Sequence, residues 1–436
     1  MIGMLSIGKI CLTLFQAGRH FFSVPYFGFV YGHAYLHRQE LKKLRSFVGV
    51  DDSCVIEAFE NQFSNVIGDG RAVSFAAGRM GFYALMQALS IKVGDEVVLQ
   101  GATCSVMANA VLRIGATPVY ADIDRNTFGS SAEAITNVLS QRTRLIVAQH
   151  SFGIPCEIAP IVELARKRGI FLLEDCALTV GSSINDIVCG NFGDAALFST
   201  DHSKPINTLS GGLVYTRDSS LLDKLRKIQA RTSSFSIRKQ KALWHQLILE
   251  RKYCKPDRYG RMRLIQLIYS NLFGITKSAF ANEDYGSSSI SYPYPARMPT
   301  FLAALGVIEI NRWHLTSLKR KEMLNRLLEV LESGLGENLP DAYFDNSRDI
   351  VPLRIAWSPK NGFIIRKKLS NMLETEGIWF MKPIIASKEP PENFGYLSES
   401  CSASEEVGKN MVNIPCNIPY EYMDEMIGNI KKNMTS

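Results

Sequence analysis

The chain has 436 residues, 46% of them hydrophobic and 21% charged, and a formal net charge of +7. This composition is typical of a globular protein, and the length allows a large core and predicts two domains. Nine cysteines are scattered without a C-x-x-C pair or a His/Cys cluster at zinc spacing. The pattern argues against a disulfide framework and a metal site, and it predicts reduced thiols in a cytoplasmic protein.

The first 35 residues are apolar, but Lys9, Arg19 and His20 interrupt them. No apolar run approaches the roughly 18 to 20 residues that a membrane span needs. Residues 1–15 match the pattern of a signal peptide only weakly. We therefore expect residues 1–50 to form an arm that docks on the protein's own body or on a second copy.

From residue 72 onward, short apolar runs alternate with helical patterns, after a helix start at Asp51-Asp52-Ser53. Strands are expected at residues 72–76, 96–100, 118–122, 145–150, 170–173, 195–198 and 212–215, and helices at 79–89, 106–114, 132–139 and 157–168. Such alternation predicts an α/β fold with a mostly parallel sheet, helices on both faces, and ligands at the carboxyl ends of the strands.

Residues 223–277 break this alternation and form a basic, helix-rich segment with fourteen Lys or Arg against three acids. Four aromatic residues interleave with the charges, namely Trp244, Tyr253, Tyr259 and Tyr269. A segment of this kind can bind a polyanion, such as a nucleotide diphosphate, or a membrane surface. The alternative is that its charges form the solvated face of a helix. The chain contains no nucleic-acid-binding motif, so no nucleic-acid partner is expected.

A Gly/Ser run at 286–289 and three nearby prolines mark a change of organisation. Residues 300–333 then have apolar residues at helical spacing, as in one long helix or two joined helices. We expect a large domain over residues 51–290 and a small C-terminal α+β domain over residues 291–436.

An acid and a lysine stand beside the apolar runs between residues 171 and 216. Asp175 closes one predicted strand, and Lys204 follows another, flanked by serines and glycines. This arrangement suits pyridoxal 5'-phosphate, whose aldehyde is bound by a lysine and whose pyridine nitrogen is kept protonated by a carboxylate. The alternative is a structural carboxylate at a strand end and an ordinary surface lysine.

The order of motifs in this region resembles that of the DegT/StrS family of pyridoxal-phosphate-dependent sugar aminotransferases. The matching residues are E-D-x-A at 174–177, G-x-x-G-D-x-x-x-F-S-x-x-x-x-K at 190–204, and Gly211-Gly212. The similarity extends from about residue 70 to about residue 430. It implies a fold-type-I transferase, and catalytic roles for Lys204 and Asp175.

The resemblance also implies a reaction and an assembly. A member of this family would convert a keto group on a nucleotide-linked sugar to an amine, with glutamate as the donor. Its product would enter lipopolysaccharide or another cell-surface polysaccharide. Family members are homodimers with shared active sites.

The cofactor's phosphate needs backbone N–H groups at a helix N-terminus. Gly78 and Arg79 follow a predicted strand and begin a helix, and the resemblance implies Ser199 as a phosphate-binding hydroxyl. In most family members the loop reads Ser-Gly-Thr, whereas a variant group has the Gly-Arg that occurs here. His202 is expected to lie near the same site.

Several positions depart from the family pattern. Leu178 replaces a glutamine that contacts the cofactor's ring hydroxyl, and Cys104 replaces an aromatic residue that stacks on the ring. We expect His150 to take over a polar contact with the cofactor. In the family, an asparagine of the segment around residue 295 touches the cofactor's phosphate in the neighbouring subunit, and Pro295 replaces it here. Arg297 is therefore the residue of this segment that we expect to reach the substrate or the neighbouring site.

Two other functions remain open at this stage. A sugar dehydratase of the same family would have histidine in place of Lys204, so the intact lysine argues against it. A non-catalytic or regulatory relative would keep the fold and use the basic segment to bind a partner or a membrane surface. The departures at Cys104, Leu178 and Pro295 keep that possibility open.

Overall fold

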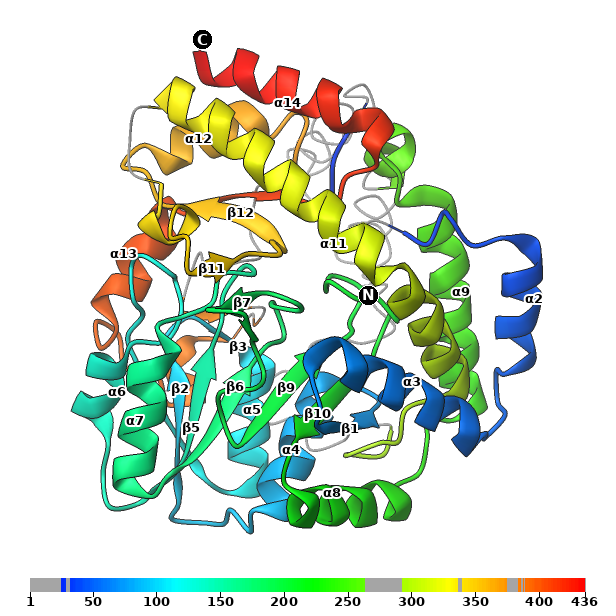
Figure 1. The fold of residues 1–436 in the computed structure, drawn as a ribbon, viewed down its shortest axis with the longest axis vertical. Coiled ribbons are helices and arrows are strands. Elements are labelled where there is room, and N and C mark those ends of the chain that lie inside the picture. The colour runs from blue at the N-terminus through cyan, green and yellow to red at the C-terminus, as the bar shows by residue number, and fades with distance from the viewer. Residues whose placement is uncertain are drawn as a thin grey trace, which may run out of the picture.

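The computed structural model describes residues 25–28, 32–262, 292–335, 339–374, 383–385, 387 and 389–435. Its centre is a seven-stranded sheet with the order β1-β10-β9-β6-β5-β2-β4 (Figure 1). The strands are β1 (Arg71–Phe75), β2 (Glu96–Gln100), β4 (Thr117–Ala121), β5 (Thr143–Gln149), β6 (Phe171–Asp175), β9 (Ala195–Ser199) and β10 (Gly212–Thr216).

The sheet is mixed and mostly parallel. Strands β4, β2, β5, β6 and β9 pair in parallel, whereas β10 runs antiparallel to both β9 and β1. The strands are buried along nearly their whole length, which explains their continuous apolar sequences. The predicted α/β fold with a mostly parallel sheet is confirmed.

Helices cover both faces of the sheet (Figure 1). They are α3 (Ser53–Ile67), α4 (Gly78–Ala88), α5 (Ser105–Ile114), α6 (Ala132–Val138), α7 (Ile158–Arg168) and α8 (Ser219–Arg231). Alternate residues of each strand point to opposite faces. Accordingly, Val98 belongs to the cluster under α6 and α7, whereas Val97 belongs to the cluster that includes α4 and α5. The predicted helix start is confirmed, since Asp52 caps α3.

One long helix, α11 (Thr300–Leu335), crosses the molecule (Figure 1, yellow). Its first turns contribute Phe301 and Leu305 to the core beside the sheet, and Leu324 and Leu327 belong to a second core. The second core also contains residues of β12 (Arg354–Trp357), α12 (Gly362–Leu369), α13 (Ser402–Asn410), β14 (Val412–Pro415) and α14 (Tyr420–Thr435). A domain boundary near residue 290 stays a prediction.

Shorter elements complete the described fold. They are α2 (Arg38–Ser46), β3 (Thr103–Cys104), β7 (Ser183–Ile184), β8 (Ile187–Val188), α9 (Ile237–Tyr253), η1 (Asp341–Tyr343), β11 (Arg348–Asp349), β13 (Ile384–Ile385) and η2 (Pro391–Phe394). β13 pairs in parallel with β3, and β11 pairs with β7. These contacts join the C-terminal part of the chain to the loops of the central sheet.

The N-terminal arm is described only in part, because residues 1–24 and 29–31 lie outside the described ranges. Phe27 is buried and forms a parallel bridge with Leu373. Its N–H donates to the carbonyl of Met372 over 2.8 Å, and its carbonyl accepts from the N–H of Glu374 over 2.9 Å. This short piece of the predicted arm therefore docks on the chain's own body.

The basic segment forms α8 and α9 in its described part. Trp244 and Tyr259 are buried, 9% and 6% exposed, so these two rings are not presented to a surface partner. Tyr269 lies outside the described residues. Binding of a polyanion or a membrane by this segment stays a prediction.

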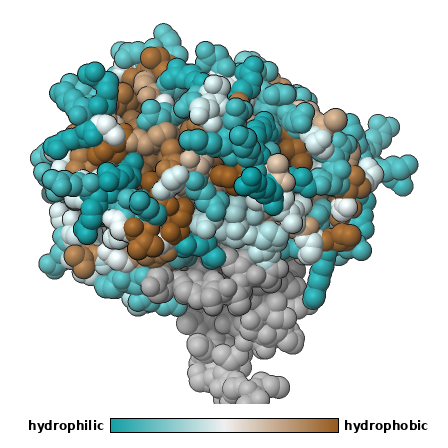
Figure 2. Space-filling model, turned by 90° about the horizontal axis from the view of Figure 1, so that it is seen from below, coloured by the Kyte–Doolittle hydropathy of each residue, from teal (hydrophilic) through white to brown (hydrophobic). Residues whose placement is uncertain are grey.

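No helix within the described ranges is both long enough and apolar enough to cross a membrane. On the face seen in Figure 2, apolar residues occur in small groups among hydrophilic ones. Scattered apolar groups of this kind are common on protein surfaces.

Two glycines allow α4 to approach the end of the sheet. A Cβ atom on Gly212 would lie 2.3 Å from Cα and 2.5 Å from N of Gly78, too close for any side chain. The neighbouring strand end would also be affected, since the same Cβ would lie 2.8 Å from the carbonyl oxygen of Phe198. The close contact fixes the first turn of α4 against β9 and β10.

Gly212→Ala is therefore expected to destabilise the protein by about 1 to 3 kcal/mol or more, because backbone atoms must move to admit the methyl group. The matched control is Gly428→Ala in α14, where an added Cβ meets nothing within 4 Å. It should be neutral or stabilise by up to about 1 kcal/mol. Urea unfolding measures both variants, and equal stabilities would contradict this account of the α4 contact.

Candidate active site

Three predicted site residues converge at one edge of the sheet. Asp175 is the last residue of β6 and is 4% exposed, and Ser199 ends the neighbouring parallel strand β9. Gly78 begins α4 directly beside them, since a Cβ at this position would lie 3.2 Å from the Cβ of Ser199. The carboxyl ends of parallel strands meet at the same sheet edge, as the sequence predicts.

The first turn of α4 has the properties of an anion site. Its N-cap residue, Ala77, provides no side-chain hydrogen bond to the helix N-terminus. An uncapped helix N-terminus directs N–H donors and the positive end of the helix dipole toward an anion. The Ser199 hydroxyl oxygen would lie only 3.4 Å from a Cβ at Gly78. A phosphate group fits this donor set, with Gly78 leaving the approach open.

Ionisable groups in this part of the molecule interact electrostatically. Burial lowers the pKa of the Lys204 amine, while Cys104 and the carboxylate of Asp201 raise it. Burial raises the pKa of the Asp175 carboxyl, whereas the N–H of Ala177 and the charge of Lys204 lower it. The N–H of Ala177 donates to Asp175 Oδ1 over 2.9 Å. Lys204 and Asp175 thus lie close enough for each to shift the other's pKa.

Cys104 is the N-cap residue of α5 and is half-buried. Burial raises the pKa of its thiol, while the N–H of Val106 and the charges of Lys204 and Arg79 lower it. Arg79 itself is 9% exposed, and its guanidinium contacts the hydroxyl of Tyr292 over 3.4 Å. The structure therefore places Cys104 and Arg79 in the same neighbourhood as the predicted lysine.

Glu174, which precedes Asp175, accepts hydrogen bonds from the loop 190–193. Its Oε1 accepts from the N–H groups of Phe192 and Gly193, both over 2.7 Å. Its Oε2 accepts from the N–H of Gly190 over 2.8 Å. Successive residues of a strand point to opposite faces, so one acid of the pair anchors the loop 190–193 while the other lies at the site. Sequence reasoning missed this role, although the G-x-x-G-D motif contains the anchored loop.

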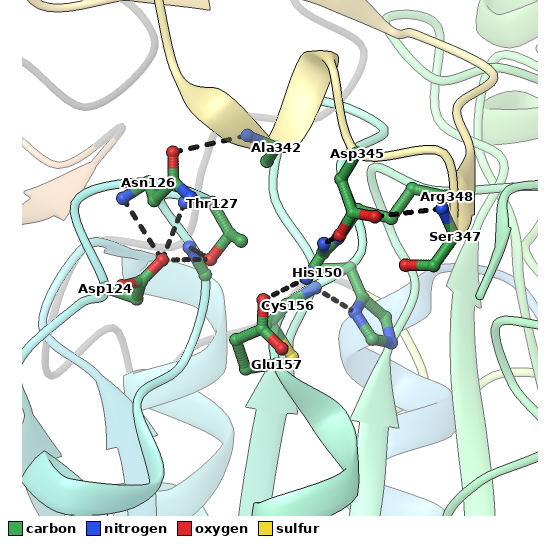
Figure 3. A network of polar contacts seen from close by, with 11 residues as sticks. Asp124, Asn126, Thr127, His150, Cys156, Glu157, Ala342, Asp345, Ser347 and Arg348 are labelled. Atoms are coloured by element: carbon green, nitrogen blue, oxygen red, sulfur yellow. Dashed lines mark hydrogen bonds and ion pairs between the residues drawn. The ribbon is translucent and has the colours of Figure 1, made fainter. Parts of the chain in front are cut away.

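His150 makes hydrogen bonds with Glu174 and Cys156. Its Nε2 lies 3.1 Å from Glu174 Oε2. Its Nδ1 accepts from the N–H of Cys156 over 3.0 Å (Figure 3). Nδ1 is therefore an acceptor, and the ring proton directed at Glu174 Oε2 is on Nε2. A contact between His150 and a cofactor stays a prediction, and it would require one of these bonds to be replaced.

The side-chain atoms of His150, Glu174 and Cys176 lie within 4.8 Å of one another, a spacing that a metal ion also requires. Hydrogen bonds already use the Glu174 oxygens and both His150 nitrogens. All three residues are buried. The group therefore has the form of a structural hydrogen-bond network.

Three other positions that the sequence singles out have described contacts of their own. His202 is half-buried in the loop before Lys204, with Nδ1 3.5 Å from Asp201 Oδ1. Arg297 forms an ion pair with Asp51, and its reach into a neighbouring subunit stays a prediction. Leu178 is 5% exposed and belongs to the second core, so it packs as an apolar residue.

The two adjacent acids predict different effects on stability. Glu174→Gln should destabilise by about 2 kcal/mol, because a neutral amide cannot accept from three buried N–H groups and a histidine. Asp175→Asn, the matched control, should cost about 1 kcal/mol or less, since it keeps an acceptor for Ala177. Thermal and urea unfolding measure both. A larger loss for Asp175→Asn would contradict the division of roles.

Comparison with known proteins agrees with this geometry. The sequence profile of the DegT/DnrJ/EryC1/StrS aminotransferase family matches residues 51–424. GDP-perosamine synthase of Escherichia coli O157:H7 is 34% identical over 193 residues, which cover 44% of this chain and 52% of that protein. UDP-N-acetyl-3-dehydro-alpha-D-glucosamine 3-aminotransferase of Acidithiobacillus ferrooxidans is 35% identical over 173 residues, 39% of this chain and 47% of that protein. The chain spans about half the length of the curated relatives it matches.

Solved structures share the fold over nearly the whole chain. PseC of Helicobacter pylori, described as an aminotransferase of pseudaminic acid biosynthesis, superposes with a TM-score of 0.70 at 17% identity and covers 94% of this chain and 99% of its own. The aminotransferase TlmJ of Streptoalloteichus hindustanus gives a TM-score of 0.69 at 20% identity, covering 94% and 98%. At these identities the likeness establishes the fold, which is that of fold-type-I aminotransferases.

Proposed function

Because the chain belongs to the DegT/DnrJ/EryC1/StrS aminotransferase family, we propose that it is a pyridoxal-phosphate-dependent aminotransferase. Its substrate is a keto-sugar linked to a nucleotide, which it converts to the amino sugar with glutamate as the donor. The substrate class follows the names of matched relatives, which include a GDP-perosamine synthase and a UDP-sugar 3-aminotransferase. The product serves a cell-surface polysaccharide.

One observation carries the proposal: the Lys204 amine and the Asp175 carboxyl influence each other's pKa beside an uncapped helix N-terminus. A flat heterocycle with an aldehyde, a basic ring nitrogen and a phosphate needs these three partners. The end of α4, with Gly78 and Ser199, would hold the phosphate. Asp175 would keep the ring nitrogen protonated, and Lys204 would hold the aldehyde.

The cofactor, when bound, supplies an electron sink that stabilises negative charge on the carbon attached to the reacting nitrogen. The protein's part is proton transfer and orientation. Burial lowers the pKa of the Lys204 amine, which favours the neutral form that attacks a carbonyl carbon and accepts a proton. Lys204 Nζ then moves a proton to or from the substrate carbon that carries the nitrogen.

We also propose that the enzyme is a cytoplasmic homodimer. The eight described cysteines are free thiols, a composition expected in a reducing compartment. The segment that carries Arg297 contacts α4, since Tyr294 Oη donates to the Arg79 carbonyl over 3.4 Å. This contact supports Arg297 as the residue through which a second copy of the chain would share the site.

The function is tested by adding pyridoxal phosphate to the purified protein, reducing with borohydride and mapping the modified lysine by peptide mass spectrometry. The expected adduct is on Lys204, with yellow absorbance before reduction. Lys319 is an internal control, because burial also lowers its pKa, to about 8, although it lies on α11. Lys204→Ala should lose the adduct and all transfer of nitrogen from glutamate to keto-sugar nucleotides.

Modification at Lys319, or at surface lysines in proportion to their exposure, would contradict the assignment of Lys204. So would full transfer activity in Lys204→Ala, measured as 2-oxoglutarate release by mass spectrometry.

The dimer is tested by sedimentation equilibrium of the full chain. The chain has a mass of 48.7 kDa, and the proposal predicts about twice that value at micromolar concentration. A monomer with full activity would contradict shared active sites.

A further inference from the structure

The loop that carries Lys204 is closed at its base by hydrogen bonds. The N–H of Thr208 donates to the carbonyl of Thr200 over 2.8 Å, and the hydroxyl oxygens of these two threonines are 2.6 Å apart. Residues 201–207 therefore leave the sheet after β9 and return to it before β10, with Lys204 in their middle. The place of the Lys204 amine depends on what holds this excursion of the chain.

Asn207, the last residue before the closure, is held from outside the loop. Its carbonyl accepts a hydrogen bond from His33 Nε2 over 2.8 Å. Because a carbonyl oxygen can only accept, the imidazole proton of His33 is on Nε2. His33 belongs to the turn at residues 32–36 of the N-terminal arm, and it is 1% exposed, while Asn207 is 7% exposed. A buried hydrogen bond thus joins the arm to the loop that carries Lys204.

Glu309 on α11 acts on the same residue of the loop. Burial raises the pKa of the Glu309 carboxyl to about 8, while the charge of Arg312 and a hydrogen bond from the backbone of Asn207 oppose this shift. Burial lowers the pKa of His33 to about 4 against its bond to Asn207, and Arg312 lowers it as well. The imidazole is therefore neutral at pH 7 and keeps its Nε2 proton for the carbonyl. Asn207 is held by the arm and by α11 together.

The turn of the arm is itself fixed on two helices. The N–H of Gly32 donates to the carbonyl of Cys254 over 3.0 Å, at the end of α9. A Cβ atom on Gly32 would lie 2.0 Å from the carbonyl oxygen of Glu250, so only glycine allows this approach to α9. On α11, the guanidinium of Arg312 lies 3.5 Å from the centre of the Tyr35 ring, as in a cation–π contact. The arm therefore offers the imidazole a rigid base.

We propose that His33 is a positioning residue, which holds the loop through the Asn207 carbonyl so that Lys204 Nζ meets the carbon to or from which it moves a proton. This inference rests on the proposed function. A misplacement of a reacting group by about 1 Å can slow a reaction about a hundredfold. Without the imidazole, the buried Asn207 carbonyl loses its donor, and the loop shifts toward another one.

The test compares His33→Leu with His33→Gln in the full chain loaded with pyridoxal phosphate. Leucine keeps a large buried side chain but has no donor, whereas glutamine has an N–H near the position of Nε2. Glutamate is added in a single turnover, and the decay of the yellow absorbance gives a limiting rate and a Kd. His33→Leu should lower the limiting rate about tenfold or more and change the Kd less than about twofold, because the carboxylates of glutamate do not bind to Lys204.

The conservative variant and a second arm variant are the controls. His33→Gln should recover the limiting rate to within about threefold of the wild type. Leu36 lies in the same turn, is 1% exposed and belongs to the core beside the sheet. Leu36→Ala should lower the urea midpoint at least as much as His33→Leu, yet keep the wild-type rate. If His33→Leu does not fold, His33→Asn replaces it, since its shorter amide has its nitrogen near the position of Nδ1.

The borohydride adduct on Lys204 is mapped in every variant. If the wild type lacks this adduct, the proposed function fails and this inference falls with it. If the adduct forms but His33→Leu keeps the wild-type rate, only the role of His33 is overturned. That role is also overturned if Leu36→Ala slows the reaction as much as His33→Leu, or if His33→Gln is as slow as His33→Leu, because the hydrogen bond to Asn207 would then not be the cause.

Discussion

The alternation of side chains along β6 separates two neighbouring acids into two environments. Glu174 faces the backbone N–H groups of the loop 190–193, and Asp175 reaches the sheet edge beside Lys204. A one-residue slip of this strand would exchange the two carboxylates and leave the loop without its anchor. The geometry of the site therefore depends on the register of β6 between β5 and β9.

A second constraint acts from the other side of the site. Gly78 and Gly212 let the first turn of α4 contact β9 and β10 at a distance that no side chain permits. The positive end of the helix dipole is thereby held next to Ser199, where a phosphate fits. Burial raises the pKa of Asp175 and lowers that of Lys204, and the charge of each group acts on the other in the opposite direction. In the proposed function, anion binding and proton transfer would thus come from separate elements at one sheet edge.

Much of the fold could be predicted because local patterns determine it. The strands over 96–100 and 195–199, the Asp52 cap and the long helix from residue 300 follow from apolar periodicity and capping chemistry. The antiparallel direction of β10 could not be predicted, since strand polarity depends on distant partners. The strand-end positions of Gly78, Asp175 and Ser199 agree with the expected alternation of strands and helices, whereas their role with Lys204 in holding a cofactor stays a prediction.

The hydrogen bonds that support the candidate site could not be predicted from the sequence pattern. The sequence shows only that His150 stands at a strand end. Its partners, Glu174 and Cys156, are determined by tertiary packing, so they could not be predicted. Glu250 occurs among many charges of a basic helix, and only its burial distinguishes it. Burial of a single charged residue cannot be read from composition or spacing.

The central claim is that Lys204 and Asp175 meet opposite ends of one flat heterocycle. A crystal structure of the protein grown with pyridoxal phosphate tests this most directly. The account predicts density continuous from Lys204 Nζ to the cofactor, a carboxylate oxygen of Asp175 at the ring nitrogen, and the phosphate at the first turn of α4. Cofactor bound elsewhere, or the two side chains directed into separate regions around an intact fold, would contradict it.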